Sequence, residues 1–511
     1  EKGRENLILQ SNQFDTTWTT ANASVTSGQS GYDGSSDAWL LQASGTFAFV
    51  RQLGLSVNGV ATASVYLKAG TTDWVNFRLS ASANNQIYVN LSNGTFGTIS
   101  AANLIDKSIE GIGNGWYRVS VVLNVSSLTG FYIYVADGDN TLNTTNETIY
   151  IQDAQLELGL VATPYIETGA STAQAGILEN TPRFDYSGGA TCPSLLLEPS
   201  RSNQITQSEY FGGWTVNTTI TANAALSPEG VQNAYNIASN SGVGNGILAI
   251  SGALSSTQYV CSIYVKSAGA TTGKLRLFDG STGASTTTTF TPTSEWQRVE
   301  VTRTSGAGTF QFRTDIHSND GDLLIYGAQL EAGSYSTSYI PTYGVSQTRA
   351  LDNCLKTGVS SLIGQSNGTL FVEVGVFPKE TNGRIFGISD GSTNKYIIII
   401  KNSTNTDFAV YVTNNGGQVT YQGTGSLNDN SKIAVGYANN DYVIYVNGTQ
   451  VHTDTSASVP TCSNIYVGQR ENGSGTYVAG GSVKQALLFK TRLSNLDLAI
   501  LTGATTYNTF A

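Results

Sequence analysis

Charge and histidine are scarce in this 511-residue chain, and their scarcity excludes several classes of function. Charged residues make up 12% of the sequence, about half the usual share. Lys and Arg total 26 against 36 Asp and Glu, a formal net charge of −10. Nucleic-acid binding needs clustered Lys and Arg, and the sequence has no such cluster, so we expect no nucleic-acid partner. The two histidines, His317 and His452, lie in polar, turn-flanked stretches, which favours surface or turn positions over a catalytic triad or a metal site.

Long apolar runs, methionine and proline are also missing or few. The most apolar short run, 396–400, has the length of a strand, whereas a membrane-spanning helix needs about 20 residues, so we expect no membrane insertion. The chain starts at Glu1 and contains no Met, which we interpret as a processed or incomplete N-terminus. Only 9 Pro stand beside 56 Gly, a balance that favours an ordered chain with many turns.

Cysteine is too dilute for a disulfide framework. The four cysteines, Cys192, Cys261, Cys354 and Cys462, show no Cys-x-x-Cys spacing for a metal. We expect free buried thiols, and Cys354 with Cys462 is the one pairing to check.

An internal repeat organises the first two thirds of the chain. Four blocks recur in the same order: 12–18 as 208–214, 63–68 as 261–266, 114–119 as 294–299, and Ala-Gln-Leu-Glu at 154–157 as 328–331. The separation between copies shrinks over the later blocks, so the second copy has shorter loops. We predict a module at 1–166, an ordered connector at 167–200, a second module at 201–345 and a region without these blocks at 346–511.

Alternation with a period of two predicts strands throughout. In 74–79, Val75, Phe77 and Leu79 alternate with Trp74, Asn76 and Arg78. Short runs of this kind, cut by Asn-Gly and Asp-Gly, are typical of antiparallel sandwiches. In the third region, Asn447-Gly448 predicts a hairpin with a type I′ turn. A short helix at 495–501 is predicted from Ser494 as its N-cap.

The repeated blocks resemble bacteriophage virion proteins. The opening 6–18 and the closing blocks 154–166 and 328–341 resemble jelly-roll modules of phage head and tail fibres, and the connector 183–201 is similar to a stretch of predicted phage fibre and appendage proteins. The third region, with 442–448, 465–468 and 483–494, resembles a concanavalin A-like, laminin G-type domain. The resemblance implies an all-β chain of two jelly-roll β-sandwiches and one concanavalin A-like β-sandwich.

No catalytic constellation is recognisable. Concanavalin-like glycosidases carry two glutamates around an aspartate on one strand, because the acid and the nucleophile must face the same side. Here Glu373 stands alone between Val372 and Val374. We therefore expect no enzyme.

Oxygen-rich loops suit calcium. The candidate ligands are Asp37, Asp137, Asp139, Asp153, Asp320 and Asp322. By resemblance to jelly-roll binding modules, Asp37 and Asp153 are expected to share a structural ion, although the second copy has Gly327 in place of Asp153. Ordinary Asp-Gly turns explain the same residues, and this alternative stays open.

Sugar binding needs aromatic rings beside planar polar groups. The stripe Trp74, Asn76 and Arg78 fits this need, and we expect a neighbouring strand to add Tyr66 and Lys68. The second copy keeps Tyr264, Lys266 and Arg276, and in the third region Tyr396, Tyr421, Tyr437 and Asn447 are weaker candidates. A shared Tyr/Lys/Arg face fits a subunit or module interface equally well.

Together these patterns predict a non-enzymatic virion fibre or decoration protein that presents glycan-binding modules to the host surface. Its expected partners are capsid or tail subunits, host cell-surface polysaccharide and further copies of the chain, as a trimer by resemblance. We expect it on the virion surface after assembly in the bacterial cytoplasm. The alternatives are a purely structural decoration protein and a secreted polysaccharide-degrading enzyme or its accessory modules. The sequence leaves open the glycan, the host and head or tail placement.

Overall fold

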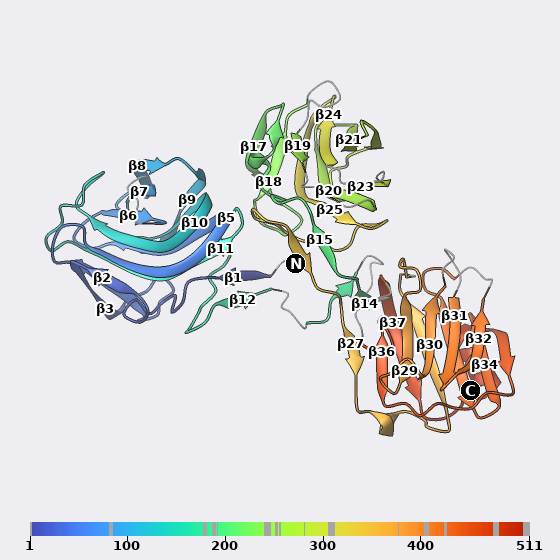
Figure 1. Ribbon diagram of the computed structural model, residues 1–511. Coiled ribbons are helices and arrows are strands. Elements are labelled where there is room, and N and C mark those ends of the chain that lie inside the picture. The colour runs from blue at the N-terminus through green and yellow to red at the C-terminus, as the bar shows by residue number, and fades with distance from the viewer. Residues whose placement is uncertain are drawn as a thin grey trace. The chain divides into compact units, whose positions relative to one another are not determined.

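The structure is a computed structural model of the chain, built almost wholly of strands (Figure 1). It describes residues 3–80, 85–176, 181–186, 191, 193–239, 247–250, 254, 257–280, 282–304, 312–376, 378–402, 408–423, 427–473 and 480–503, without the side chains of 247, 248, 250 and 312–315. The chain divides into two compact units, Glu1–Glu179 with Ser202–Gln347 and Asn180–Arg201 with Thr348–Ala511. The predicted all-β class of antiparallel sandwiches is confirmed. Among the described residues, no helix is long and apolar enough to cross a membrane.

Ten strands of the first sandwich form one antiparallel sheet folded into two layers. They are β2 (Thr19–Ala21), β3 (Ala23–Gln29), β4 (Ala38–Ala43), β5 (Phe49–Ala69), β6 (Trp74–Arg78), β7 (Asn85–Asn90), β8 (Thr95–Ala101), β9 (Leu104–Gly113), β10 (Trp116–Ala136) and β11 (Thr148–Leu158). The 21-residue strands β5 and β10 serve both layers. One end of β10 pairs with β9 and the other with β6, while β5 pairs with β11 along one half and with β2 along the other. A core that includes Val65, Phe77 and Ile133 fills the space between the layers.

The second sandwich has two separate five-stranded sheets, in the orders β16-β19-β24-β21-β22 and β17-β18-β25-β20-β23. Its elements are η1 (Phe211–Gly213), β16 (Thr215–Val216), β17 (Ile220–Ala225), β18 (Ala234–Ile237), β19 (Ile247–Ile250), β20 (Gln258–Ala268), β21 (Gly273–Asp279), β22 (Ser285–Phe290), β23 (Gln297–Thr304), β24 (Phe312–Ser318) and β25 (Asp322–Ala332). Two short pairs flank the sandwiches: β1 (Arg4–Asn6) with β12 (Ala173–Ala175), and β15 (Arg201–Asn203) with β26 (Gln347–Arg349).

A buried asparagine near the start of each copy binds the backbone of the closing block. Asn203 is fully buried. Its amide donates to two backbone carbonyls at 2.8–3.0 Å and accepts from two backbone N–H groups at 3.0–3.1 Å. These backbone groups belong to Ile205, Ala328, Leu330 and Ile340. Asn6 makes the same four bonds in the first copy.

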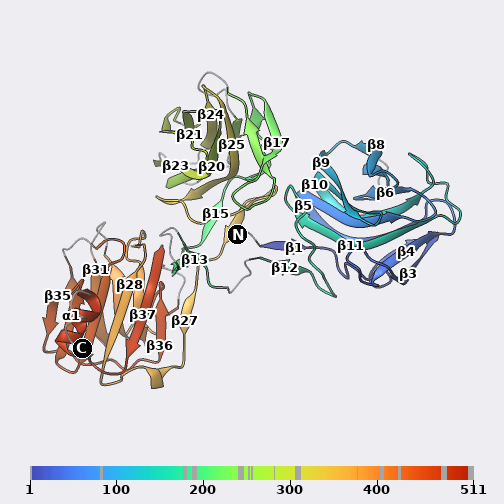
Figure 2. The ribbon, with the colours of Figure 1, turned by 180° about the vertical axis from the view of Figure 1, so that it is seen from behind.

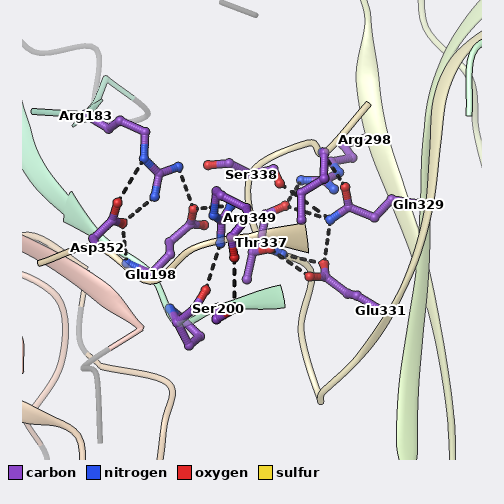
Figure 3. Close-up of polar contacts among 12 residues, drawn as sticks. Arg183, Glu198, Ser200, Arg298, Gln329, Glu331, Thr337, Ser338, Arg349 and Asp352 are labelled. Carbon is purple, nitrogen blue, oxygen red and sulfur yellow. Dashed lines mark hydrogen bonds and ion pairs between the residues drawn. The ribbon is translucent and has the colours of Figure 1, made fainter. Parts of the chain in front are cut away.

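The Gln and Glu of the block continue this network (Figure 3). Gln329 donates to Glu331 at 2.7 Å and accepts from the backbone N–H of Ile340 at 2.7 Å. Glu331 accepts from both the backbone N–H and the hydroxyl of Thr337 at 2.7 Å. Gln155, Glu157 and Thr163 repeat the pattern in the first copy. The most conspicuous repeated residues therefore hold the returning segment against the last strand.

The third sandwich stacks a seven-stranded sheet, β13-β14-β37-β28-β33-β34-β35, on a six-stranded one, β27-β36-β29-β30-β31-β32. Its elements are β13 (Phe184–Asp185), β14 (Ser194–Leu197), β27 (Cys354–Lys356), η2 (Ser360–Leu362), β28 (Asn367–Val374), β29 (Arg384–Ser389), β30 (Lys395–Lys401), β31 (Phe408–Asn414), β32 (Gly417–Gln422), β33 (Lys432–Ala438), β34 (Asp441–Val446), β35 (Thr449–Asp454), β36 (Asn464–Val467), β37 (Gly481–Phe489) and α1 (Asn495–Gly503). α1 packs against β33, β34 and β35 (Figure 2).

Two local predictions in this sandwich are confirmed. Ser494 caps α1, because its hydroxyl accepts from the backbone N–H of Asp497 at 3.1 Å. Asn447 and Gly448 both have positive φ, 46° and 86°, as a type I′ turn requires.

Part of the predicted connector belongs to the third sandwich. β14 pairs with β37 and extends the seven-stranded sheet, and Arg183 pairs with Asp352 and with Glu198, the latter at 2.8 Å (Figure 3). Arg349 adds a second bond to Glu198 at 2.8 Å. Strand pairing and ion pairs therefore hold this part of the connector in place.

The cysteines described are free. Cys261 and Cys462 are buried and Cys354 is half-buried, so the suggested Cys354–Cys462 bridge is absent. Burial raises the pKa of Cys462 to about 12, which keeps this thiol protonated. Cys192 lies outside the described residues.

Candidate functional site

β6 presents Trp74, Asn76 and Arg78 on the outer face of its layer. Val75 and Phe77, which alternate with them, are fully buried in the core, as a period of two requires. The structure therefore brings these three predicted site residues together.

The cross-strand register adds further aromatic and polar side chains to the same face. Two rows run across β5, β10, β6 and β7. They are Arg51, Tyr132, Arg78 and Gln86 in one row, and Phe49, Tyr134, Asn76 and Tyr88 in the next. We call these residues, together with Trp74, the arginine–tyrosine face.

Both arginines of this face stack on aromatic rings. The Arg78 guanidinium lies 4.4 Å from the ring centre of Tyr134 and donates to Asn76 Oδ1 at 2.5 Å and to Gln86 Oε1 at 3.0 Å. The Arg51 guanidinium lies 5.2 Å from Phe49 and 5.6 Å from Tyr132. Cation–π contacts of this kind fix a guanidinium in place without neutralising its charge.

Much of the arginine–tyrosine face is buried. Asn76 is 0% and Arg78 7% exposed, whereas Trp74 is half-buried. The sequence suggested an open stripe. The difference arises because Tyr134 and Tyr88 lie directly opposite Asn76 on both sides and the Arg78 guanidinium stacks on the Tyr134 ring. Burial raises the pKa of Tyr134 and of Tyr88 while the charge of Arg78 opposes both shifts, so these tyrosines stay neutral donors.

One donor on this face has no partner. The Asn76 side-chain nitrogen is buried and makes no hydrogen bond within the described part of the chain. A buried amide nitrogen without an acceptor costs about 1–3 kcal/mol. A bound acceptor at this point would remove that cost.

Tyr66 and Lys68 do not join the arginine–tyrosine face, contrary to the expectation. They lie in the half of β5 that pairs with β11 and the first part of β10, so they belong to the other layer. Tyr66 stacks on Tyr32 with ring centres 3.8 Å apart and clusters with Trp116. The reason is that 70–73, between β5 and β6, connects the two layers instead of forming a hairpin within one.

The second copy shows the same separation. Tyr264 and Lys266 lie on β20, while Arg276 lies on β21 in the other sheet. The prediction of one Tyr/Lys/Arg face shared by both copies is therefore wrong. Arg298 stacks on Tyr264 at 5.4 Å, so this tyrosine adjoins the closing network.

The three candidate tyrosines of the third region do not share one surface. Tyr396 points to the outer side of the six-stranded sheet beside Tyr411. Tyr421 packs on the core residue Phe408 at 5.4 Å and on His452 at 5.1 Å, so it faces inward. Tyr437 is fully buried, which confirms its core role.

His317, His452 and Glu373 lie on three different strands, β24, β35 and β28. His317 is 3% exposed on β24, so its predicted surface position is wrong, and His452 is half-buried on β35. Glu373 lies 3.8 Å from Lys432 and 3.9 Å from Lys484. The described residues contain no group of three or more His, Cys, Asp and Glu side chains placed to hold a metal ion.

The loop aspartates bind backbone and side-chain donors. Asp139 accepts from the backbone N–H and the hydroxyl of Thr98 at 2.7 and 3.0 Å, and Asp137 from Asn143 at 3.0 Å. Hydrogen bonds from the hydroxyls of Thr271 and Ser318 lower the pKa of Asp320 to about 2, and Asp322 accepts from Asn236 and Ser239. The contacts of Asp137 with Asn143 and of Asp320 with Ser318 are local to a turn. The other contacts join segments that are more than 40 residues apart.

Asp37 and Asp153 lie on either side of Asn12. The Asn12 side chain donates to the Asp37 carbonyl at 3.3 Å and accepts from the Asp153 backbone N–H at 3.2 Å. Asp153 is 6% exposed and accepts from the Tyr32 hydroxyl at 2.9 Å. Burial, together with the negative charges of Asp37 and Asp33, raises the pKa of Asp153 to about 7. A cation here would relieve that repulsion, so the shared calcium stays a prediction for this pair.

Calcium binding by this pair is tested by thermal unfolding at pH 8. With dissociation constants typical of extracellular modules, 10 mM calcium should raise the melting temperature by about 3 to 10 °C. The variant Asp153→Asn should lose this rise, and magnesium should not reproduce it. An unchanged melting temperature on adding calcium, or after a chelator, would contradict the prediction.

Sequence reasoning missed Arg51, Tyr88, Tyr132 and Tyr134. A signal for three of them was present in the sequence, because Phe49 and Arg51 alternate with the apolar Val50, and Tyr132 and Tyr134 with the apolar Ile133. Assigning these residues to one face with Arg78 also requires the strand order, in which β10 lies between β5 and β6.

Comparison with known proteins gives only distant likenesses. No protein-family model and no curated protein sequence matches the chain. Similar solved structures include the Ruminococcus gnavus IT-sialidase CBM40 bound to α2,3-sialyllactose, at 15% identity and a TM-score of 0.26 over 29% of this chain and 98% of that one. The CBM22-1–CBM22-2 tandem of Paenibacillus barcinonensis Xyn10C is 11% identical, with a TM-score of 0.21 over 66% of this chain and 99% of that one. Mouse laminin α1 LG4-5 is 11% identical, with a TM-score of 0.20 over 61% of this chain and 93% of that one. At such TM-scores these likenesses do not bear on what this chain binds.

Proposed function

We propose that this chain is a non-enzymatic surface protein of a phage virion and that its first sandwich binds a host-surface glycan through the arginine–tyrosine face. The observation that carries the glycan part is the set of aromatic rings, amides and guanidinium groups on one sheet face. The resemblance of the repeated blocks and the connector to phage fibre and appendage proteins supports the virion part.

The chemistry of the face suits a sugar. A pyranose ring presents one apolar side, which packs on an aromatic ring, while its hydroxyls need planar hydrogen-bonding groups. Trp74 is half-buried and so keeps part of its ring accessible. The unpartnered nitrogen of Asn76 belongs to the residue two strand positions beyond Trp74, on the same face.

A purely structural decoration protein is the second candidate. The burial of Asn76 and Arg78 favours it, because packed polar side chains also serve to fix a sheet face. In that case capsid or tail subunits, or further copies of the chain, would be the partners, and no glycan would bind.

Binding to a glycan array with the variant Trp74→Ala tests the proposed function. Loss of a stacking ring should weaken binding at least tenfold, about 1.4 kcal/mol or more. The matched control is Trp296→Ala, which removes a half-buried tryptophan of the second sandwich and should leave binding unchanged.

Three other outcomes separate the alternatives. Binding that survives Trp74→Ala would place the site elsewhere in the chain. Equal losses in both tryptophan variants would indicate a folding defect, which unfolding midpoints would reveal. Absence of binding to any host polysaccharide would favour the structural decoration protein.

A further inference from the structure

Two guanidinium groups flank one tyrosine on the arginine–tyrosine face. The register sets Arg51 and Arg78 directly opposite Tyr132, one on each neighbouring strand. Strand spacing in a sheet is about 4.8 Å, so the backbones of Arg51 and Arg78 lie about 10 Å apart, with Tyr132 between them. This row is therefore a local concentration of positive charge in a chain of net charge −10.

Within the described residues, neither arginine contacts a carboxylate. Arg78 donates to the amides of Asn76 and Gln86, and Arg51 donates to the Thr19 hydroxyl at 3.3 Å. Some arginines elsewhere are neutralised by carboxylates, as Arg384 is by Glu471 at 3.1 Å and Arg492 by Asp441 at 2.9 Å. Arg118 and Arg298 instead donate to hydroxyl groups and backbone carbonyls.

Acidic groups do approach the opposite end of the face. Asp137 and Asp139 raise the pKa of Tyr88 through their charge, whereas Arg78 lowers it. Asp139 accepts from the backbone N–H of Thr98 on β8, and Asp137 accepts from that of Asn143 in its own loop. The face is thus polarised, with its cationic end at Arg51, Tyr132 and Arg78.

We propose that the ligand of this face is an acidic polysaccharide, with a carboxylate or sulfate group held between Arg51 and Arg78. This inference rests on the proposed function and names its substrate class. A guanidinium matches the two oxygens of a carboxylate or sulfate with parallel N–H donors. The free donor of Asn76 supplies a third bond to a ring oxygen or hydroxyl. The half-buried Arg51 meets the ligand first, and the deeper Arg78 orients the anionic group.

Two matched pairs of polymers test the proposal. Polygalacturonate is compared with its methyl ester, and dextran sulfate with dextran, so that each pair differs only in its negative charge. We expect the wild-type chain to bind at least one acidic member at least tenfold more tightly than its neutral partner. Carboxylate and sulfate sources are distinguished by which pair shows the preference.

The variants Arg51→Gln and Arg78→Gln should each reduce this preference at least tenfold. The control is Lys68→Gln, which removes one positive charge from the other layer of the same sandwich and should leave the preference intact. Because Arg51 is only half-buried, its variant keeps the test valid if Arg78→Gln unfolds.

Each result decides a different point. Binding of neutral polymers alone, still lost in Trp74→Ala, would overturn the acidic class and leave the proposed function standing. If Lys68→Gln loses the preference for acidic polymers to the same extent, the preference depends on the overall charge of the chain, and the site between Arg51 and Arg78 is overturned. If neither these polymers nor any glycan of the array bind, the proposed function fails together with this inference.

Discussion

Asn203→Ala is expected to destabilise the second sandwich by about 3 to 5 kcal/mol. The substitution leaves two backbone N–H groups and two backbone carbonyls without the partners that Asn203 provides. Each buried group left unsatisfied costs about 1–3 kcal/mol, and water entering the small space offsets part of the sum. The free energy of unfolding from denaturant titration, with hydrogen exchange of β25 as a local probe, measures the loss.

The first copy provides an internal repetition of this experiment. Asn6→Ala removes the same four bonds and should weaken the first sandwich by a similar amount. Asn319→Ala, at an exposed position of the second sandwich, is the matched control and should cost less than about 0.5 kcal/mol. If Asn203→Ala costs no more than this control, the repeated block has no structural role.

Asp153→Asn is expected to remove a pH dependence of stability. Burial, with repulsion from Asp37 and Asp33, raises the pKa of Asp153 from 3.8 to about 7. Between about pH 4 and pH 7 the folded chain therefore holds a proton that the unfolded chain has lost. The free energy of unfolding should fall as pH rises through this window, by up to about 4 kcal/mol, and level off above about pH 8.

The Asn variant should show no such fall and should be the more stable protein at pH 8. Asn also tolerates the positive φ of 51° at this position. Unfolding at pH 5 and pH 8 measures the difference, with Asp73→Asn at an exposed site as the control. A wild-type chain that is equally stable at both pH values would show that Asp153 is not raised in this way.

Local patterns in the sequence were sufficient for much of the fold. The alternation in 74–79 predicted which β6 side chains enter the core, and Asn447-Gly448 and Ser494 predicted a turn and a helix start that the structure contains. These features depend on neighbouring residues alone, which is why the sequence is enough to find them.

The composition of the candidate site depended on pairing between distant strands. Tyr66 and Trp74 are close in sequence, yet they lie on different layers because β5 continues from one layer into the other. Arg51 and Arg78 are far apart in sequence, yet they meet across Tyr132. Register of this kind follows from sheet order, which composition and spacing do not determine.

Hydrogen–deuterium exchange with and without the tightest-binding glycan from the array tests the central claim most directly. The account predicts slower exchange in β6, in the Phe131–Ala136 part of β10 and in the first residues of β5, with the third sandwich unchanged. Protection confined to the third sandwich, or the absence of any glycan that binds, would contradict the claim that the arginine–tyrosine face is a glycan-binding site.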